Sequence, residues 1–286
     1  MAFLLLCPMF ISFNGKLLPA EEPVFLAANR GYRYGDGLFE TMKIVNGKIR
    51  LEALHFERLM KGITLLKMEK PGLFSPEKLA REILHLSVKH KANELGRVRL
   101  SVFRGNGGLY DGDRTLQYLI ECWPLPDSFR QLNQNGLEID IFTEARKSID
   151  PYSGLKTANF LPYTMASIYA KEQKLNDCLL LNTAGTIADS TIANLFIYTG
   201  DRFITPGPTQ GAVDGVMRRY LISSMRAAGY LVDEAPVTIT DLAQAQEVFL
   251  TNAIHGIKWV RRFRDHHYQN RQADELYSRF VQTIQG

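Results

Sequence analysis

The chain has 286 residues, 45% of them hydrophobic, which is enough to bury more than one core, so we expect two domains. Its formal net charge of +4 is small, and basic residues are scattered among nearly as many acidic ones. No basic stripe with interleaved aromatic residues is present, so we expect no nucleic-acid partner. The most basic stretch, residues 258–267, is interpreted as a solvated loop or a strand edge.

The N-terminal residues 1–13 are apolar but lack the basic segment and cleavage site of a signal peptide, and the run is too short to cross a bilayer. The cysteines Cys7, Cys122 and Cys178 lie far apart in apolar surroundings, which predicts buried free thiols in a reducing compartment. The histidines form no close pair except 266–267, so we expect no metal site. These features predict a cytoplasmic protein without membrane contact.

Hydrophobic periodicity predicts an N-terminal domain of strands and two helices. The predicted strands are 9–19 and 37–51, which fold back at the Asn-Gly pairs 14–15 and 46–47, then 97–105 and 116–126. The predicted helices are 51–68 and 75–91. Ser75 followed by Pro76 is typical of a helix start. Because prolines end the last strand, we place a boundary between domains 1–124 and 125–286.

The strand at 97–105 alternates between apolar and polar side chains. Val98, Leu100 and Val102 share one face, and the other face carries Arg97, Arg99, Ser101 and Phe103. This pattern fits a sheet with one solvated face. It fits equally an arginine that points into a polar pocket.

The second half of the chain mixes strands and helices. The predicted strands are 137–143, 177–182, 194–206 (a hairpin) and 247–253, and the predicted helices are 159–174, 214–229 and 273–285. This order lacks the regular alternation of a Rossmann fold, and no G-x-G-x-x-G follows a strand. We therefore expect an α+β protein whose sheets are largely antiparallel or mixed.

Lys156 follows a Pro-Tyr-Ser-Gly turn and precedes a predicted helix. Such a lysine is either an ordinary solvated charge or a reactive amine. A reactive amine needs an aldehyde partner, and the usual one is pyridoxal phosphate (PLP). A PLP site also needs a phosphate cradle and a carboxylate for the ring nitrogen.

Other parts of the chain offer both features. A Gly-rich turn runs into the helix at 214–229, whose first free N–H groups belong to Gly215, Val216 and Met217; this is either a plain helix start or a phosphate site. Arg58 shares a helix face with His55 and is either solvated or a phosphate clamp. Asp189 is either a turn residue or the partner of a pyridine nitrogen, and residues 251–253 are either a polar turn or phosphate donors.

Six stretches, in the same order along the chain, resemble the motifs of fold-type IV PLP enzymes. That family contains branched-chain and D-amino-acid aminotransferases and 4-amino-4-deoxychorismate lyase. The stretches are RGYRYGDGLFETMKIVNGKI, HFERL, GLKTANFLPYTMA, ADSTIANLF, GVMRR and TNA. The resemblance covers nearly the whole chain. It departs from the family at Asp189, where the family usually carries glutamate.

The resemblance implies a two-domain α+β fold, with a small N-terminal α/β domain, a larger C-terminal domain with mixed sheets, and a cofactor cleft between them. It also implies a homodimer in which a neighbour's loop completes the pocket. Lys156 then forms the Schiff base with PLP and moves the proton, and Asp189 binds the pyridine nitrogen. The remaining cofactor residues would hold the phosphate: Arg58, Val216, Met217 and Asn252.

For the substrate, the resemblance implies that Arg99 binds a carboxylate and that Arg33, Tyr34 and Phe39 line the pocket. The leading hypothesis is a PLP-dependent aminotransferase acting on amino acids, of branched-chain-like specificity. The first alternative is 4-amino-4-deoxychorismate lyase, which releases pyruvate and 4-aminobenzoate. An alternative of another class is a non-catalytic PLP-binding protein. The Arg-x-His pattern of familiar D-amino-acid enzymes is absent after Arg104-Gly105.

Overall fold

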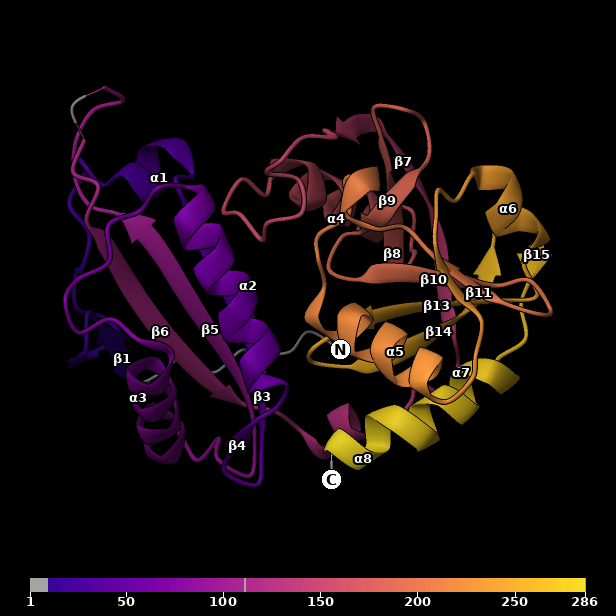
Figure 1. Cartoon of the computed structure of the whole chain (residues 1–286), viewed down its shortest axis with the longest axis horizontal. Coiled ribbons are helices and arrows are strands. Elements are labelled where there is room, and N and C mark those ends of the chain that lie inside the picture. The colour runs from indigo at the N-terminus through magenta and orange to yellow at the C-terminus, as the bar shows by residue number, and fades with distance from the viewer. Residues whose placement is uncertain (1–9, 111, 286) are drawn as a thin grey trace. The chain divides into compact units, whose positions relative to one another are not determined.

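A computed structural model describes residues 10–110 and 112–285. The chain forms two compact units (Figure 1). The N-terminal unit runs to Phe129 and also includes Lys156–Asn159, and the C-terminal unit comprises Arg130–Leu155 and Phe160–Gln285. The division therefore falls after Phe129, and the domain boundary after Pro124 stays a prediction. A four-residue stretch of the second half of the chain belongs to the N-terminal unit.

The N-terminal unit is built on a six-stranded antiparallel sheet with the strand order β2-β1-β6-β5-β3-β4. The strands are β1 (Phe10–Phe13), β2 (Lys16–Pro19), β3 (Gly37–Val45), β4 (Lys48–Ile49), β5 (Leu95–Arg104) and β6 (Leu116–Pro124). Both predicted Asn-Gly hairpins are confirmed. Asn14 and Gly15, like Asn46 and Gly47, have positive φ, which the tight two-residue hairpin turn requires.

The helices of this unit are α1 (Arg30–Tyr34), α2 (Glu52–Leu65) and α3 (Pro76–Lys89). The Ser75 hydroxyl accepts a hydrogen bond from the Lys78 N–H, which confirms the predicted start of α3. Helices α2 and α3 cover the face of the sheet to which even-numbered residues of β3, β5 and β6 point, because Glu40 contacts α2 and Tyr118 contacts α3. Val98, Leu100 and Val102 are fully buried on this face, as their alternation predicts.

The opposite face, here called the second face, carries the odd-numbered side chains of β3, β5 and β6. Its ionisable members are Lys43, Arg97, Arg99 and Glu121. The three central strands thus separate an apolar face beneath the helices from a face rich in charge.

The C-terminal unit contains a nine-stranded sheet with the order β12-β11-β10-β13-β14-β7-β8-β9, and β15 pairs with β14. The strands are β7 (Leu137–Lys147), β8 (Asp177–Asn182), β9 (Ile187–Ser190), β10 (Asn194–Tyr198), β11 (Phe203–Thr205), β12 (Val232–Glu234), β13 (Glu247–Asn252), β14 (Gly256–Phe263) and β15 (His266–His267). Pairs β7–β8, β7–β14 and β11–β12 are parallel and the others antiparallel. The predicted mixed sheet is confirmed.

The helices of this unit are α4 (Leu161–Glu172), α5 (Val216–Ala227), α6 (Ile239–Gln244), α7 (Arg271–Leu276) and α8 (Gln282–Gln285), with a π-helical segment at Tyr277–Val281. Their apolar faces close a core in which Phe196 and Phe249 stack with ring centroids 5.0 Å apart. The predicted helices at 159–174 and 214–229 correspond to α4 and α5. The predicted terminal helix exists but is interrupted by the π-helical segment.

The interpretation of residues 258–267 as a solvated loop or strand edge is wrong. Most of this stretch belongs to β14, an interior strand between β13 and β7. Val260 and Phe263 are buried in the core, whereas Arg261 and Arg262 both pair with Glu138 on β7. The run of basic residues suggests solvation, but Glu138 on a neighbouring strand neutralises two of their charges.

Cys122 and Cys178 are buried free thiols, as expected, and Cys7 lies outside the described residues. Within the described part of the chain, no helix combines the length and the apolar character needed to span a membrane.

Candidate functional site

Lys156 is held at the edge of the N-terminal sheet. Strand β3 pairs with β4 only through its last residues, so its beginning has free backbone groups on that side. The segment from Lys156 fills this edge: the Phe39 N–H donates to the Lys156 carbonyl at 2.9 Å, and the Ala158 N–H donates to the Gly37 carbonyl at 2.9 Å. Because an unpaired strand edge seeks backbone partners, this pairing fixes the position of the lysine.

The Lys156 side chain lies against an aromatic ring that it shares with an arginine. Lys156 Nζ is 4.5 Å from the centroid of the Phe39 ring, and Cζ of Arg99 is 3.9 Å from the same centroid. Arg99 Nε also donates to the Ser101 hydroxyl at 3.2 Å. The structure therefore brings together three residues that the sequence named: the candidate reactive amine, the candidate carboxylate ligand and a candidate pocket residue.

Arg58 belongs to a buried cluster on the other face of β3. Its Nε and Nη2 donate to the Glu40 carboxylate at 2.8 and 2.5 Å. His55 Nδ1 lies 2.7 Å from the same carboxylate. The predicted shared helix face of His55 and Arg58 is thus confirmed, and both side chains converge on Glu40.

Sequence reasoning missed Glu40 as the centre of this cluster. The signal was present, because even-numbered residues of β3 face the helix that carries His55 and Arg58. Burial alone would raise the pKa of the Glu40 carboxyl, but the Arg58 charge and hydrogen bonds from His55 and Arg58 lower it to about 2. Burial lowers the pKa of His55; the Glu40 carboxylate opposes this shift without cancelling it, and the charges of Arg58 and Lys156 lower the pKa further. His55 is therefore a neutral ring that donates from Nδ1 to an ionised Glu40.

Arg33 and Tyr34 lie in α1, where Asn29 caps the first turn. Arg33 Nε donates to the Ala27 carbonyl at 2.9 Å, and Tyr34 is 41% exposed. Asp36, just after α1, links this helix to β5. Its carboxylate accepts a hydrogen bond from Arg30 Nε at 2.9 Å and also pairs with Arg104. The contacts described for Arg33 and Tyr34 do not include Lys156, so their role in a pocket stays a prediction.

Asp189 is a buried carboxylate of the C-terminal unit. One of its oxygens, Oδ2, accepts three hydrogen bonds: from Lys147 Nζ at 2.8 Å, from the Tyr163 hydroxyl at 3.1 Å and from the Val213 N–H at 3.0 Å. The other oxygen, Oδ1, is buried and has no hydrogen-bond partner among the described residues. The sequence indicated Asp189 but gave no signal for Lys147 or Tyr163, which come from β7 and α4.

This half-satisfied carboxylate fits a PLP ring nitrogen. A buried polar atom without a hydrogen-bond partner is costly. Three hydrogen bonds to Oδ2 hold the Asp189 carboxylate in place, so its Oδ1 is suited to accept a hydrogen bond from a ligand. A protonated pyridine nitrogen is such a donor.

The start of α5 fits the phosphate of the same cofactor. Its N-cap is Gly215, and no side chain caps the first turn, so the N–H groups that follow are open to an anion. A Cβ on Gly215 would lie 1.7 Å from Asn194 Oδ1, which shows how closely the chain is packed there. The Asn194 amide donates to the Val213 carbonyl at 2.8 Å. Because the Val213 N–H donates to Asp189, Val213 links the start of α5 to that carboxylate.

Asn252, predicted to contact phosphate, ends β13. Its Oδ1 accepts from the Ile254 and His255 N–H groups at 3.0 and 2.9 Å, so it organises the turn that follows. The preceding Thr251 has a buried hydroxyl without a partner among the described residues. Thr251 pairs with Asn194 across strands β13 and β10. Asn194 in turn donates to Val213, which lies just before α5.

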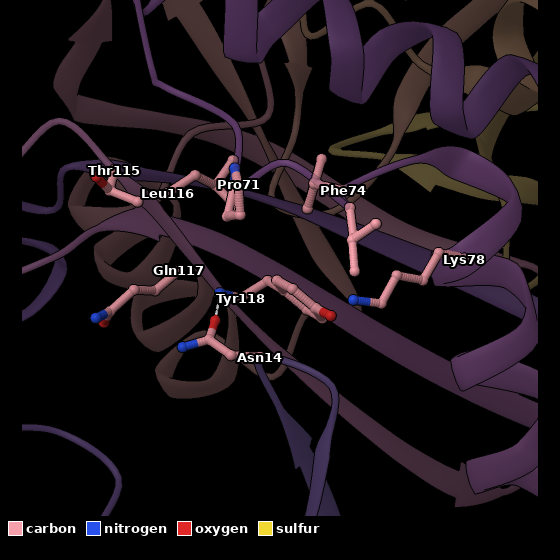
Figure 2. Close-up of a pocket in the computed structure, with 9 residues that line it drawn as sticks. Asn14, Pro71, Phe74, Lys78, Thr115, Leu116, Gln117 and Tyr118 are labelled. Carbon is pink, nitrogen blue, oxygen red and sulfur yellow. Dashed lines mark hydrogen bonds between the residues drawn. The ribbon is translucent and has the colours of Figure 1, made fainter.

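A separate hollow of about 270 Å³ lies in the N-terminal unit (Figure 2). It is lined by Asn14, Pro71, Leu73, Phe74, Lys78, Thr115, Leu116, Gln117 and Tyr118. Its most enclosed polar groups already have protein partners, because the Tyr118 N–H donates to Asn14 and the Tyr118 hydroxyl to Glu82. None of the predicted site residues lines it.

A family model described as amino-transferase class IV matches residues 37–263. An aminodeoxychorismate lyase of Vibrio harveyi is 27% identical over 80% of this chain and 83% of its own length. A D-alanine aminotransferase of Listeria monocytogenes is 26% identical over 85% of this chain and 84% of its own length.

Among solved structures, the branched-chain aminotransferase of Thermoproteus uzoniensis with norvaline superposes with a TM-score of 0.87. It is 19% identical, and the match covers 97% of this chain and 95% of that one. At this identity the likeness concerns the fold, and it confirms the predicted fold type.

Proposed function

Since the chain belongs to the class IV aminotransferase family, whose members are PLP-dependent enzymes, we propose that it transfers the amino group of amino acids with apolar, branched-chain-like side chains to 2-oxo acids. The chain is an enzyme and its cofactor is PLP. The choice of reaction and of substrate is the proposal.

The observation that supports it is the shared contact of Lys156 and Arg99 with the Phe39 ring. Amino acids and 2-oxo acids carry a carboxylate next to the reacting carbon. A guanidinium close to the candidate reactive amine can bind that carboxylate and so orient the substrate. The Phe39 ring, which lies against both cations, is the apolar group that the proposal places next to the substrate side chain.

The proposal assigns Lys156, Arg58, Asp189, Val216, Met217 and Asn252 to the cofactor. PLP supplies an aldehyde and a ring that stabilises negative charge on the substrate carbon. Lys156 would hold the aldehyde end of the cofactor through its amine, and the same amine, when free, would move the substrate proton as base and acid. Asp189 Oδ1 would accept a hydrogen bond from the protonated ring nitrogen and so keep that nitrogen charged. Arg58, the Val216 and Met217 N–H groups and Asn252 bind phosphate.

Borohydride reduction followed by peptide mapping tests the role of Lys156. We expect the purified protein to be yellow and the reduced cofactor to be attached to Lys156. Lys156→Ala should abolish amine turnover, whereas Lys171→Ala, at an exposed position of α4, should leave it intact. Turnover by the Lys156→Ala protein at the wild-type rate would end the assignment.

A second candidate function is aminodeoxychorismate lyase, because a relative of that name matches 80% of the chain. Both reactions use the same cofactor groups, so only products separate them. Amino donors should convert the bound cofactor to its aminated form if the enzyme is an aminotransferase. Release of pyruvate and 4-aminobenzoate from aminodeoxychorismate, without this conversion, would favour the lyase. A yellow protein with neither activity would contradict both candidate reactions.

Arg33, Tyr34 and Phe39 are proposed to line the substrate pocket, with Arg99 as the carboxylate ligand. Arg99→Leu should weaken the binding of carboxylate substrates far more than the binding of simple amines, because only carboxylates contact the guanidinium. Equal losses for both classes would contradict this role.

We also propose a homodimer. Exposed apolar side chains gather around α1 and the loop before β6, at Leu26, Tyr32, Leu109 and Tyr110, and Tyr110 is 97% exposed. Side chains of this kind are enriched at protein interfaces. Light scattering coupled to gel filtration should give twice the 32.4 kDa mass of one chain.

A further inference from the structure

The first turn of α5 carries an arginine that the proposed function does not use. Arg218 follows Val216 and Met217, is 1% exposed and is among the largest fully buried side chains of the described residues. The turn reads Val-Met-Arg-Arg and contains no acidic residue. A buried cation at the positive end of a helix dipole is unfavourable twice, because it loses hydration and is repelled by the dipole. The contacts of Arg218 must offset this cost.

A chain of three hydrogen bonds joins Arg218 to the sheet of the C-terminal unit. Its Nε donates to the Thr205 hydroxyl at 3.1 Å, and its Nη2 donates to the Glu234 carboxylate at 2.6 Å. The Thr205 hydroxyl in turn donates to the Leu195 carbonyl at 2.7 Å. Thr205 ends β11, Glu234 ends β12, and Leu195 belongs to β10. The first turn of α5 is thus fixed to three neighbouring strands.

Strand β10 also holds the chain just before α5. Leu195 follows Asn194, and the Asn194 amide donates to the Val213 carbonyl. The Val213 N–H in turn donates to Asp189. One strand therefore grips the chain on both sides of the N-cap, directly before it and through Arg218 after it. These contacts fix the N–H groups of the first turn relative to Asp189.

We propose that Arg218 is a positioning residue for the cofactor phosphate. It acts through the helix, because it holds the first turn of α5 so that the Val216 and Met217 N–H groups keep a fixed distance from Asp189. Its charge also adds to the positive end of the helix dipole, which favours an anion there. This inference rests on the proposed function, in which the phosphate binds at the start of α5 and the ring nitrogen binds at Asp189.

The shape of the arginine side chain suits this role. A planar guanidinium presents several donors in fixed directions, so one group reaches Thr205 and Glu234 at the same time. A lysine ammonium keeps the charge but offers no such fork. Arg218→Lys should therefore recover only part of what an uncharged substitution loses.

Titration calorimetry of the full-length apoprotein with pyridoxamine phosphate and with pyridoxamine tests the positioning role. The two ligands share the ring and differ by the phosphate, and neither carries the aldehyde that reacts with a lysine. We expect wild-type protein to prefer pyridoxamine phosphate. Arg218→Met should weaken pyridoxamine phosphate binding about tenfold to a hundredfold, the range of a hydrogen bond to a charged group, and change pyridoxamine affinity less than about threefold.

Variants of Thr205 keep the test open if Arg218→Met does not fold. Thr205→Val removes the hydroxyl that links Arg218 to β10 and leaves the contact with Glu234 in place. Because the lost group is a neutral hydroxyl, pyridoxamine phosphate binding should weaken only about threefold to tenfold. Thr205→Ser retains the hydroxyl and should bind both ligands as wild type does.

Arg226→Met is the matched control. Arg226 lies in the last turn of the same helix and pairs with the same carboxylate, Glu234, at 3.5 Å. Because it is far along α5 from the first turn, its loss should leave the affinities for both ligands unchanged. Equal losses of both ligands in Arg218→Met would indicate general damage to the fold and would overturn the positioning role, as would wild-type binding of pyridoxamine phosphate by Thr205→Val.

The titration also separates this inference from the proposed function. A wild-type protein that binds both ligands equally would overturn the phosphate assignment and the role of Arg218 together. A protein that prefers pyridoxamine phosphate and keeps that preference in Arg218→Met overturns the positioning role alone. A protein whose preference falls in Arg218→Met, yet which transaminates nothing, overturns the proposed reaction and leaves the role of Arg218 standing.

Discussion

Glu40 in the N-terminal unit and Asp189 in the C-terminal unit are both buried carboxylates, but the protein satisfies them to different degrees. Both Glu40 oxygens accept from Arg58, and His55 adds a further bond. Asp189 receives three donors on Oδ2 and none from the described residues on Oδ1.

This difference separates two uses of a buried charge. A carboxylate with both oxygens engaged holds its neighbours in place, and Glu40 fixes the Arg58 guanidinium in this way. A carboxylate with one oxygen anchored and the other open can accept a ligand without moving. The following predictions test whether Glu40 acts as a support and Asp189 as a ligand acceptor.

The largest expected effect on stability comes from Glu40→Gln. Removing the charge takes from buried Arg58 the carboxylate that accepts both of its described hydrogen bonds, which costs about 3–5 kcal/mol of unfolding free energy. Thermal and urea unfolding should report this loss. Glu121→Gln is the matched control, because Glu121 is a half-buried carboxylate of the same sheet without an ion-pair partner in the described chain, and it should cost less than about 1 kcal/mol. Equal losses would erase the contrast between paired and unpaired carboxylates.

Asp189→Asn should lower stability, because it removes the counter-ion of buried Lys147, but its distinguishing effect is expected on the reaction. The amide cannot keep a ring nitrogen charged, so kcat should fall about 10²–10³-fold, or roughly 3–4 kcal/mol. Steady-state kinetics with saturating PLP measure this loss. Asp233→Asn, at an exposed ion pair of β12, serves as the control and should retain wild-type kcat. Wild-type kcat in Asp189→Asn would remove Asp189 from the proposed site.

Acid should reveal the Glu40 cluster through its pH dependence. Because the folded pKa of Glu40 lies at about 2, below its ordinary 4.5, this group stabilises the fold above pH 4.5, and its contribution disappears as the pH falls toward 2. The loss amounts to up to about 3 kcal/mol. Unfolding measured across this pH range should fall more steeply for wild type than for Glu40→Gln. Parallel curves would mean that Glu40 has an ordinary pKa.

The smallest effect is expected at the start of α5. Gly215→Ala would push a Cβ into Asn194 and disturb the link to Asp189, which we expect to cost about 1–3 kcal/mol in PLP binding. Equilibrium dialysis of PLP measures it. Gly72→Ala, where an added Cβ meets no atom within 4 Å and φ is not positive, is the control and should bind PLP like wild type.

The sequence determined the elements whose signals are local. The Asn-Gly hairpins, the Ser75 cap and the alternation of β5 follow from backbone preferences and from side-chain spacing within a few residues. The order of six motifs was also sufficient to identify the family, because such order is independent of three-dimensional contacts.

Only the tertiary structure decided which charges meet. Lys156 joins β3 from more than a hundred residues away, Glu40 closes on Arg58, and Lys147 and Tyr163 reach Asp189 from separate elements. These contacts join parts of the chain whose spacing in sequence carries no signal, since sheet pairing and helix packing set the distances. For the same reason the sequence suggests that the basic residues of β14 are solvated, whereas the structure pairs Arg261 and Arg262 with Glu138.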